Sequence, residues 1–299
     1  MSQVVLILSG LPASGKSTFA RKWVDEDAES RVRINFDDLR ATYSDWHGGS
    51  WLPFKRDNEK HVKVKAAELA TAALTEGKSI VIDNCNLTPK ARQPWVDLAS
   101  SFGVPVEVED FDTPIPTCVS RDLKREARVG RAVIERMALF TGWIDWSDPD
   151  QYEPDERFIV VDVDGTLADC THRRNYLNTV PKDWDAFFAA CHQDPSFSKI
   201  VTLVQHLSVK WSILVVSGRP LDKCGLATEG WLYSHLGPRV RHLFMRNDGD
   251  RRDDPIVKQE ILDLLPKDRI DLVLDDRDRV VEMWRTNGLT CLQVAKGDF

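Results

Sequence analysis

The chain has 299 residues, more than most single domains of roughly 100–200 residues, and this length favours two domains. Its composition, 42% hydrophobic and 29% charged, is that of a folded globular protein and excludes a mainly disordered one. The net charge of −7 excludes a surface that is basic throughout, although a local basic groove for a polyanion is still compatible with it.

The first half of the chain alternates short apolar runs with helical patterns. Val4–Ser9 is predicted to be a buried strand, and Lys16–Asp25 the helix that follows it. Further strands are predicted at 31–36, at 79–82 and from Val104 onwards. Residues 117–140 are strongly basic and helical in character. Strands separated by helices indicate a parallel sheet, with ligands expected at the carboxyl ends of its strands.

Acids, prolines and aromatic residues break the periodicity in TGWIDWSDPDQYEPDE, residues 141–156. We therefore predict a first domain at 1–142, a linker at 143–156 and a second domain at 157–299. The second domain repeats the pattern, with strands predicted in RFIVVDVDG, WSILVVSG and RIDLVLDD. The expected fold class is α/β, with two three-layer domains built on parallel sheets.

A phosphate-binding loop is predicted between the first strand and the first helix. GLPASGKS, residues 10–17, fits G-x-x-x-x-G-K-[ST] in full. Backbone amides in such a loop hold the phosphates of ATP, the lysine reaches the β- and γ-phosphates, and the serine is a ligand of Mg²⁺. The residues predicted to bind the ATP phosphates are Gly10, Ser14, Gly15, Lys16, Ser17 and Thr18. The structural alternative is a strand–helix turn that binds nothing.

Asp37 is the candidate base that accepts the proton of an attacking hydroxyl, because it follows the second predicted strand in NFDDLR. Arg40, one helical turn on, is a candidate contact for a phosphate of the acceptor. The structural alternative is that Asp37 or Asp38 caps a helix beginning at Leu39.

Two further segments supply candidates for the same site. Asp83 and Asn84 end the third strand and suit the water shell of a metal or the acceptor, although a structural role is nearly as well supported. We favour Arg125, with Arg121 second, as the arginine that stabilises charge on the transferring phosphoryl group.

The second domain carries a pair of acids after its first strand. Asp162 and Asp164 in DVDGT are two residues apart, so on extended backbone both carboxylates face one pocket. Asp162 is the predicted nucleophile that forms an aspartyl-phosphate, and Asp164 the acid that protonates the departing oxygen. Gly165 permits the turn away from the strand, and Thr166 is a further predicted substrate contact.

Later strand ends supply the remaining parts of this second site. Ser217 and Arg219 in VVSGRP are predicted to bind the phosphate, and Lys258 to neutralise the nucleophile and the transferred group. The predicted metal ligands, all oxygen donors of the kind that Mg²⁺ prefers, are Ser17 in the first domain and Asp162, Asp164, Asp275 and Asp276 in the second.

The order of DVDGT, VSGR, a lysine and DD resembles the haloacid dehalogenase superfamily of phosphatases. With the phosphate-binding loop before it, and with INFDDLR, DNCNL and the closing VVEMWRTNGLTCLQVAKGDF, nearly the whole chain resembles the bifunctional polynucleotide 5′-kinase/3′-phosphatases of T-even bacteriophages. The departures are Phe36, where the phage enzyme has an arginine, Asn84 in place of an aspartate, and a different segment at 170–195.

The resemblance implies a kinase at 1–142 and a phosphatase at 157–299, with a small cap at about 169–198 in which Arg173 or Arg174 supplies an arginine. It implies an ATP- and Mg²⁺-dependent enzyme of RNA and DNA repair. This enzyme phosphorylates 5′-hydroxyl ends and removes 3′-phosphates, with 2′,3′-cyclic phosphate as a further candidate substrate. An RNA ligase as functional partner, a homo-oligomer with the tetramer as candidate state, and the host cytoplasm as location follow from the same resemblance.

Two other functions fit the same motifs. A small-molecule kinase, for a nucleoside or sugar, fused to a nucleotide or sugar phosphatase would need the same catalytic fragments. A scaffold with decayed sites is the alternative from another class, and the intact lysine, serine and carboxylates argue against it. For nucleic-acid contact, the stretches 121–136 and 239–252 are the predicted backbone-binding segments.

The six cysteines show no paired spacing, which argues against a zinc site or a disulfide framework and fits a reducing cytoplasm. The seven histidines form no ligand cluster, and none is assigned a role. No stretch approaches the length needed to span a bilayer, so we expect a soluble protein with no membrane partner.

Overall fold

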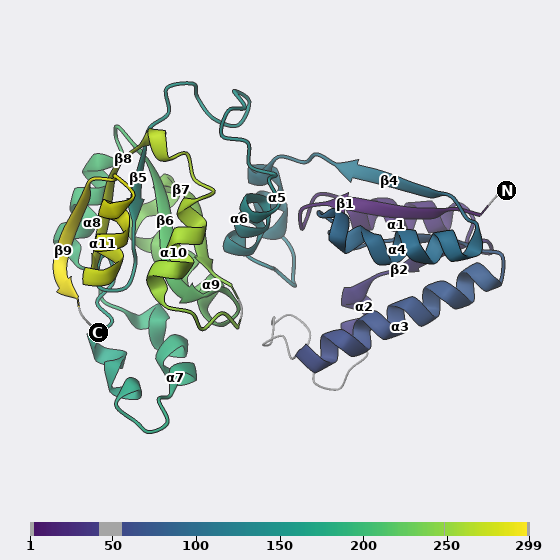
Figure 1. The fold of residues 1–299 in the computed structure, drawn as a ribbon, viewed down its shortest axis with the longest axis horizontal. Helices are drawn as coiled ribbons and strands as arrows, with labels where there is room; N and C mark the ends of the chain where they lie inside the picture. Colours follow the sequence, from purple (N-terminus) through teal and green to yellow (C-terminus); the bar gives the residue numbers. More distant parts are fainter. Residues whose placement is uncertain (1–2, 42–55, 248, 298–299) are drawn as a thin grey trace. The chain divides into compact units, whose positions relative to one another are not determined.

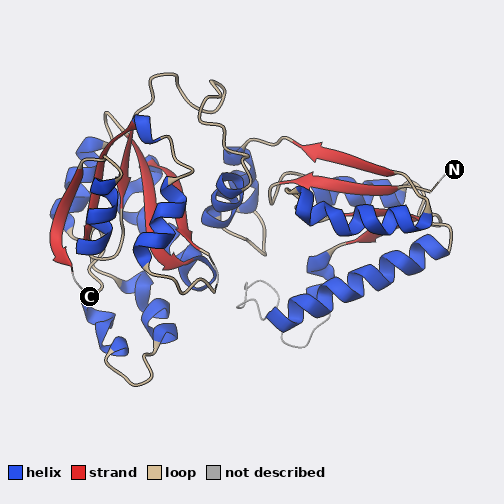
Figure 2. Cartoon of the chain, viewed as in Figure 1, coloured by secondary structure: helices blue, strands red, loops and turns tan. Residues whose placement is uncertain are grey.

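The computed structural model describes residues 3–41, 56–247 and 249–297. The chain divides into two compact units, Met1–Val129 and Gly130–Phe299, each built on one parallel sheet (Figures 1 and 2). Among the described residues, no helix has both the length and the apolar character that crossing a membrane requires. The predicted α/β class with two parallel sheets is confirmed.

The first unit contains a four-stranded sheet in the order β2-β3-β1-β4. The strands are β1 (Val5–Gly10), β2 (Arg31–Ile34), β3 (Ser79–Ile82) and β4 (Val106–Phe111). The helices are α1 (Lys16–Asp25), α2 (Phe36–Arg40), α3 (Arg56–Thr75), α4 (Pro89–Phe102) and α5 (Ile115–Asp122). All six residues of β1 are buried, because it is an inner strand covered on both faces.

Alternate side chains of β1 pack into two different cores. Val5 and Ile7 join a cluster that includes residues of α3 and α4. Leu6 and Leu8 join a second cluster with Ala20 of α1. Helices therefore lie on both faces of the sheet, which leaves the carboxyl ends of the strands as the open edge for a ligand.

The second unit contains a five-stranded sheet in the order β7-β6-β5-β8-β9. The strands are β5 (Phe158–Val161), β6 (Ser212–Pro220), β7 (Val240–Arg246), β8 (Ile270–Arg277) and β9 (Cys291–Gly297). The α-helices are α6 (Arg131–Phe140), α7 (Trp184–Ala189), α8 (Ser198–Leu207), α9 (Leu221–Leu236), α10 (Asp254–Leu262) and α11 (Asp278–Thr286). The 3₁₀ helices are η1 (Thr171–Leu177), η2 (Ala190–Gln193), η3 (Gly237–Arg239) and η4 (Lys267–Arg269).

The segment 169–198, here called the cap, joins β5 to the helix α8 that precedes β6. It contains η1, α7 and η2, and in Figure 1 it lies beyond the carboxyl ends of the strands of the second unit. Its position places it over the site that the strand-end acids were predicted to form.

The division between the units falls before α6, whereas the predicted first domain runs to residue 142. The side chains of Glu135 and Arg136 are partners of β7: Glu135 accepts from the amide of Leu243 over 2.6 Å, and Arg136 donates to the carbonyl of Met245 over 2.6 Å. These charged residues suggest an exposed helix in the sequence, but they are only 2% and 5% exposed. Their partners could not be inferred from local pattern.

The stretch 239–252, predicted to bind a nucleic-acid backbone, is instead largely committed to the fold. His242 and the three residues after it are buried in β7, a strand that the sequence pattern missed. Arg246 pairs with Asp254, and Arg252 pairs with Asp250 and Glu260. These two arginines are therefore already paired within the unit, and contact of this stretch with a nucleic-acid backbone stays a prediction.

Candidate active sites

The loop between β1 and α1 closes around the ammonium group of Lys16. Nζ donates to the carbonyl oxygens of Gly10 and Leu11 over 2.8 and 2.6 Å, and lies 3.2 Å from Oγ of Ser14. A Cβ on Gly10 would meet Ser14 Oγ at 2.9 Å, so only glycine fits there. Gly15, with φ of 114°, is the N-cap residue of α1, and the free amides of that helix terminus favour an anion. Thr18 lies in the first turn of the same helix.

Asp83 is the acid at the end of β3 that the loop contacts. Oγ of Ser17 lies 3.1 Å from Oδ1 of Asp83, whose side chain is 1% exposed. Arg33 binds the same carboxylate through Nε over 2.7 Å. The pair of oxygens from Ser17 and Asp83 fits Mg²⁺, which binds few protein carboxylates and takes its other ligands from phosphates and water. From the sequence, Asp83 is predicted only as a residue for the water shell of a metal or for the acceptor, and its place at a strand end beside the loop is the sequence signal for a closer role.

Asp37 and Asp38 do not cap α2, so the structural alternative for them is wrong. Asn35 is the cap, because its side chain accepts from the amide of Asp38 over 3.0 Å. Asp37 keeps a 55% exposed side chain and pairs with Arg40 over 2.5 Å. Its carboxylate is therefore accessible to a substrate hydroxyl.

Arg40 is oriented by Glu59, a residue of α3 that the sequence analysis missed. Its Nε and Nη2 meet the two carboxylate oxygens of Glu59 at 2.6 and 3.1 Å. Burial alone lowers the pKa of an arginine, but Glu59 and Asp37 outweigh it and raise the pKa of Arg40. No local pattern distinguishes this glutamate from its neighbours on a charged helix.

Asn84 connects the end of β3 to the start of α2. Its Oδ1 accepts from the amide of Phe36 over 3.1 Å, whereas its buried Nδ2 has no hydrogen-bond partner within the described chain. The side chain thus has a structural contact and one donor left for a ligand, so both predicted roles are compatible with its position.

Arg121, and not Arg125, contacts the phosphate-binding loop. Nη1 of Arg121 donates to the carbonyl of Ser14 over 3.1 Å. Arg125 lies 3.5 Å from Asp122 and its side chain is 43% exposed. The helix α5 ends at Asp122, so the expected helical character of residues 117–140 is interrupted at 123–130. Of the two candidate arginines, the second choice is therefore the one with a hydrogen bond to the loop in the described chain, and its role in phosphoryl transfer stays a prediction.

In the second unit, three buried carboxylates gather at the ends of β5 and β8. One oxygen each of Asp162, Asp275 and Asp276 lies within 4.8 Å of the others. Nζ of Lys258 stands among them, 2.7 Å from Asp162 Oδ1 and 2.8 Å from Asp275 Oδ2. The structure thus brings together the four residues that were predicted to share this site.

The charge balance of this cluster favours a bound cation. Burial, followed by the neighbouring Asp275 and Asp276, raises the pKa of Asp162 well above its ordinary value, although Lys258 opposes the effect. Burial and Asp275 raise the pKa of Asp276 to about 6. A Cβ on Gly165, whose φ is +87°, would overlap the Asp276 carboxylate, so the turn is shaped around this acid. The all-oxygen donor set and the excess negative charge fit Mg²⁺.

Asp164 is not part of this cluster, because its carboxylate turns toward two arginines. Oδ1 of Asp164 accepts from Arg173 Nη2 and from Arg219 Nη2, each over 2.5 Å. Both arginine side chains are 0% exposed. Burial would raise the pKa of Asp164, but the two guanidinium groups hold it below the ordinary value. Arg173 rather than Arg174 is thus the cap arginine that reaches the site.

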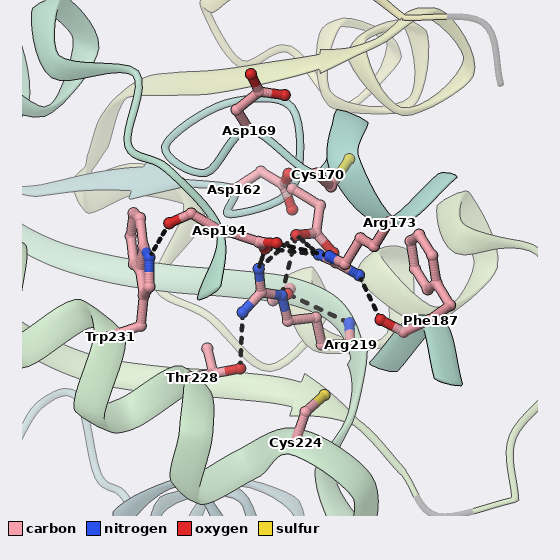
Figure 3. A network of polar contacts seen from close by, with 12 residues as sticks. Asp162, Asp169, Cys170, Arg173, Phe187, Asp194, Arg219, Cys224, Thr228 and Trp231 are labelled. Atoms are coloured by element: carbon pink, nitrogen blue, oxygen red, sulfur yellow. Dashed lines mark hydrogen bonds and ion pairs between the residues drawn. The ribbon is translucent and has the colours of Figure 1, made fainter. Parts of the chain in front are cut away.

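Asp194 of the cap holds the same two arginines from the other side, and the sequence analysis missed it. Its carboxylate accepts from Arg173 Nε over 2.8 Å, from Arg219 Nη2 over 2.6 Å and from His172 Nε2 over 2.8 Å. Trp231 donates to its backbone carbonyl over 2.7 Å (Figure 3). An acid in an irregular segment carries no sequence signal of this role.

Three further polar residues border the site. Thr166 is fully buried, and its hydroxyl has no partner within the described residues. Ser217, 1% exposed, accepts from the amide of Arg219 over 3.3 Å. Asp254, another missed acid, binds Arg246 and Arg277 at 2.7 and 3.1 Å. The hydroxyls of Thr166 and Ser217 are well suited to phosphate oxygens.

A phosphate-binding loop thus lies on one parallel sheet and a capped acid cluster on the other, an arrangement suited to phosphoryl transfer in the first unit and phosphate removal in the second. Residues 156–299 match the family model of the polynucleotide kinase PNKP phosphatase domain, and residues 5–140 match the AAA domain. Residues 156–299 therefore belong to the family of polynucleotide kinase phosphatase domains, and residues 5–140 to the family of AAA domains.

Named relatives agree with this assignment. The chain is 24% identical over 302 residues to the "Putative bifunctional polynucleotide kinase/RNA ligase" of Autographa californica nuclear polyhedrosis virus, covering 95% of this chain and 41% of that protein. It is 33% identical over 104 residues to the "Bifunctional polynucleotide phosphatase/kinase" of Schizosaccharomyces pombe, covering 35% of this chain and 20% of that protein. The chain spans less than half the length of either relative.

Among solved structures, a chain of the "Structure of the Pnkp1/Rnl/Hen1 RNA repair complex" is 24% identical. The aligned region covers 100% of this chain and 97% of the chain in that structure, with a TM-score of 0.41.

Proposed function

We propose that this chain heals broken polynucleotide ends. The first unit transfers the γ-phosphate of ATP to a 5′-hydroxyl end, and the second unit removes a 3′-phosphate. The observation that carries the proposal is the buried set of Asp162, Asp275, Asp276 and Lys258, in a domain that matches the phosphatase model of polynucleotide kinases. A nucleoside or sugar kinase fused to a small-molecule phosphatase is not favoured, because it would not account for this match.

In the kinase, the chain's own groups position the donor and the acceptor. The loop amides and Lys16 hold the triphosphate, while Asp37 takes the proton of the attacking 5′-hydroxyl. Arg40, fixed by Glu59, binds a phosphate of the acceptor strand, and Arg121 neutralises charge on the transferring group. A magnesium ion at Ser17 and Asp83 would neutralise phosphate charge when ATP is present.

In the phosphatase, Asp162 attacks phosphorus and the leaving 3′-oxygen takes a proton from Asp164, which then activates water to hydrolyse the aspartyl-phosphate. Lys258 favours the ionised form of Asp162, because its ammonium group lies 2.7 Å away, and it thereby opposes the effect of burial and of the neighbouring carboxylates on the pKa of Asp162. Thr166, Ser217 and Arg219 supply donors for the phosphate oxygens. A magnesium ion at Asp162, Asp275 and Asp276 would neutralise charge on the phosphoryl group.

Arg173 and Arg219 influence whether Asp164 carries a proton. In the present arrangement Arg173 and Arg219 favour the ionised carboxylate. A phosphate that draws these guanidinium groups toward its own oxygens weakens that effect, so Asp164 becomes able to take up and deliver a proton. Substrate binding and acid catalysis are thereby connected through the same two side chains.

The products of the two reactions, a 5′-phosphate and a 3′-hydroxyl, are the ends that a ligase joins. We therefore propose an RNA ligase as functional partner, supported by the name of the baculovirus relative. Action on both RNA and DNA ends, a cytoplasmic location, a homo-oligomer and a bacteriophage origin stay proposals that rest on the resemblance.

Paired variants test the assignment. Lys16→Ala is expected to abolish phosphorylation of a 5′-hydroxyl oligonucleotide and to spare removal of a 3′-phosphate, whereas Asp162→Asn is expected to do the reverse. RNA, DNA, 2′,3′-cyclic ends and free nucleosides are compared as substrates. Loss of both activities in either variant, or faster turnover of nucleosides than of strands, would refute the proposal.

A further inference from the structure

The cap exposes large side chains beside the phosphatase site. Tyr176 is 41% exposed, Val180 99% and Trp184 46%. Tyr176 and Trp184 lie at the two ends of one loop, which is closed by a hydrogen bond of 2.9 Å from the amide of Asp183 to the carbonyl of Tyr176. Burying an indole or a phenol stabilises a fold, so side chains left open in this way mark a contact surface.

The indole of Trp184 is held in a fixed orientation. It stacks on Phe188 with ring centroids 5.8 Å apart and planes 21° apart, and it meets the edge of Phe187 at 5.8 Å. Packing of this kind leaves the ring little freedom to turn, although the residue keeps almost half of its surface open. An exposed but immobilised aromatic plane is what a nucleic-acid base stacks on.

A short series of contacts joins this plane to the reacting phosphate's site. Phe187, the neighbour of Trp184, lies under the guanidinium of Arg173, with 4.1 Å between the ring centroid and Cζ (Figure 3). Arg173 in turn binds Asp164 over 2.5 Å. Two side chains, Phe187 and Arg173, therefore connect the indole to the acid that acts on the 3′-oxygen.

A cation lies beside the indole of Trp184, a residue that stands in the sequence between the exposed acids Asp183 and Asp185. Nζ of Lys182 lies 5.8 Å from the centroid of the Trp184 ring, so a cation stands next to the exposed plane. Stacking together with a nearby positive charge is the combination by which proteins bind single-stranded nucleic acid without reading its sequence.

We propose that Trp184 and Tyr176 form a stacking site for a base close to the 3′ end of a single-stranded polynucleotide. This inference rests on the proposed phosphatase function and deepens it, because it makes the strand, and not the terminal phosphate alone, the recognised substrate. The occupant is a nucleobase within the last three nucleotides, and the site selects strands over small phosphate esters.

The experiment combines removal of the side chain with removal of the base. The kcat/KM for phosphate release is measured on 3′-phosphorylated oligonucleotides that are intact or that carry one abasic residue at each of the last three positions. The enzymes are the wild type, Trp184→Ala, Trp184→Leu, Tyr176→Ala and, as a matched control, Tyr233→Ala, which removes a tyrosine 69% exposed on α9. Glycerol phosphate serves as the small ester without a base.

The expected result is a loss of about 5-fold or more in kcat/KM on the intact strand for Trp184→Ala. For the wild type, an abasic residue at one of the three positions should lower kcat/KM by a similar factor. In Trp184→Ala, the same abasic residue should cause little further loss of kcat/KM. Trp184→Ala should turn over glycerol phosphate at the wild-type rate, and Tyr233→Ala should keep the wild-type kcat/KM on the intact strand. Trp184→Leu, which keeps apolar packing in the cap, should reproduce the loss on strands.

Three outcomes would overturn the inference. One is that an abasic residue at each of the three positions lowers kcat/KM in Trp184→Ala by the same factor as in the wild type. Another is an equal loss on strands and glycerol phosphate in both Trp184 variants, which would make the residue a packing element. The third is no change on strands at all, which would leave the surface to a protein partner. If the wild type released phosphate only from the small ester, the proposed function itself would fail, and this result is distinct from the other three.

Discussion

Nζ of Lys258 donates a hydrogen bond to Oδ1 of Asp162 across 2.7 Å, although 96 positions separate the two residues in the sequence. The same ammonium group binds Asp275, and all three side chains are almost completely buried. One buried cation thus serves a site with three buried carboxylates. This imbalance connects the stability of the second unit to the chemistry that its site performs.

Replacing Lys258 by alanine should destabilise the second unit by about 3–5 kcal/mol, because it leaves buried carboxylates without their partner. Phosphatase activity should be lost while kinase activity persists. Denaturant unfolding of the full chain measures the change, and added Mg²⁺ should restore part of the stability by supplying positive charge.

Lys267→Ala is the control for this change. Its partner Asp263 lies 3.3 Å away in an exposed pair, so the expected cost is only about 0–1 kcal/mol. Equal unfolding midpoints for the two variants would show that the buried contact contributes no more than the surface one.

The strand-end acids could be predicted from the sequence, but the directions of their side chains could not. Alternation along extended backbone predicted that Asp162 and Asp164 share one pocket. The strand β5 ends at Val161, and Gly165 turns the chain with a φ of +87°, so the rule no longer applies at Asp164. Its carboxylate therefore faces Arg173 and Arg219.

The missed residues share another physical cause. Glu59, Asp194 and Asp254 act by binding arginines that are distant in the sequence or lie in irregular segments. A phosphate-binding loop is recognisable because the backbone geometry requires glycines at fixed spacing. An acid that orients an arginine is subject to no such spacing, so only the fold identifies it.

Arg121→Ala should reduce kinase activity more than Arg125→Ala does. Of these two arginines, Arg121 is the one with a hydrogen bond to the phosphate-binding loop in the described chain, 3.1 Å from Nη1 to the carbonyl of Ser14. If it stabilises charge on the transferring group, its removal should lower kcat by about 100-fold or more. For the more exposed Arg125 we expect a loss below about 10-fold.

Steady-state transfer from labelled ATP to a 5′-hydroxyl oligonucleotide measures both variants, and phosphatase activity reports whether the chain is intact. A larger loss in Arg125→Ala would restore the order of preference that the sequence suggested.

Gly165→Ala should damage the phosphatase far more than Gly288→Ala does. Both glycines have φ values above +80°, so each substitution should cost about 1–3 kcal/mol of backbone strain. A Cβ at Gly288 meets no atom within 4 Å, whereas one at Gly165 overlaps the carboxylate of Asp276. Asp276 must then turn away, and a misplaced group in a site of this kind costs about 100-fold in rate.

The comparison of activity with stability separates the two effects. Unfolding should be shifted to a similar degree in both variants, while only Gly165→Ala should lose phosphatase activity and the stabilisation by Mg²⁺. If both variants kept full activity, the close approach of Asp276 to this turn would not be needed for function.

Glu135 should make the stability of the second unit depend on pH. Burial would raise the pKa of this carboxyl, but Arg131, His242 and the amide of Leu243 outweigh it and hold the pKa below the ordinary value of 4.5. Because the folded pKa is the lower one, the stabilisation is complete above about pH 4.5 and is lost as the pH falls through the folded value. Glu135→Gln should therefore lower the unfolding free energy by about 2 kcal/mol at pH 7.

The deficit of Glu135→Gln should shrink below pH 4.5, where the wild-type carboxyl also becomes neutral. Denaturant unfolding at about pH 7, 5 and 3.5 follows this convergence. Glu282→Gln, at an exposed position of α11, controls for general effects of charge. A deficit that stayed constant with pH would mean that the shape of the Glu135 side chain, and not its charge, connects α6 to β7.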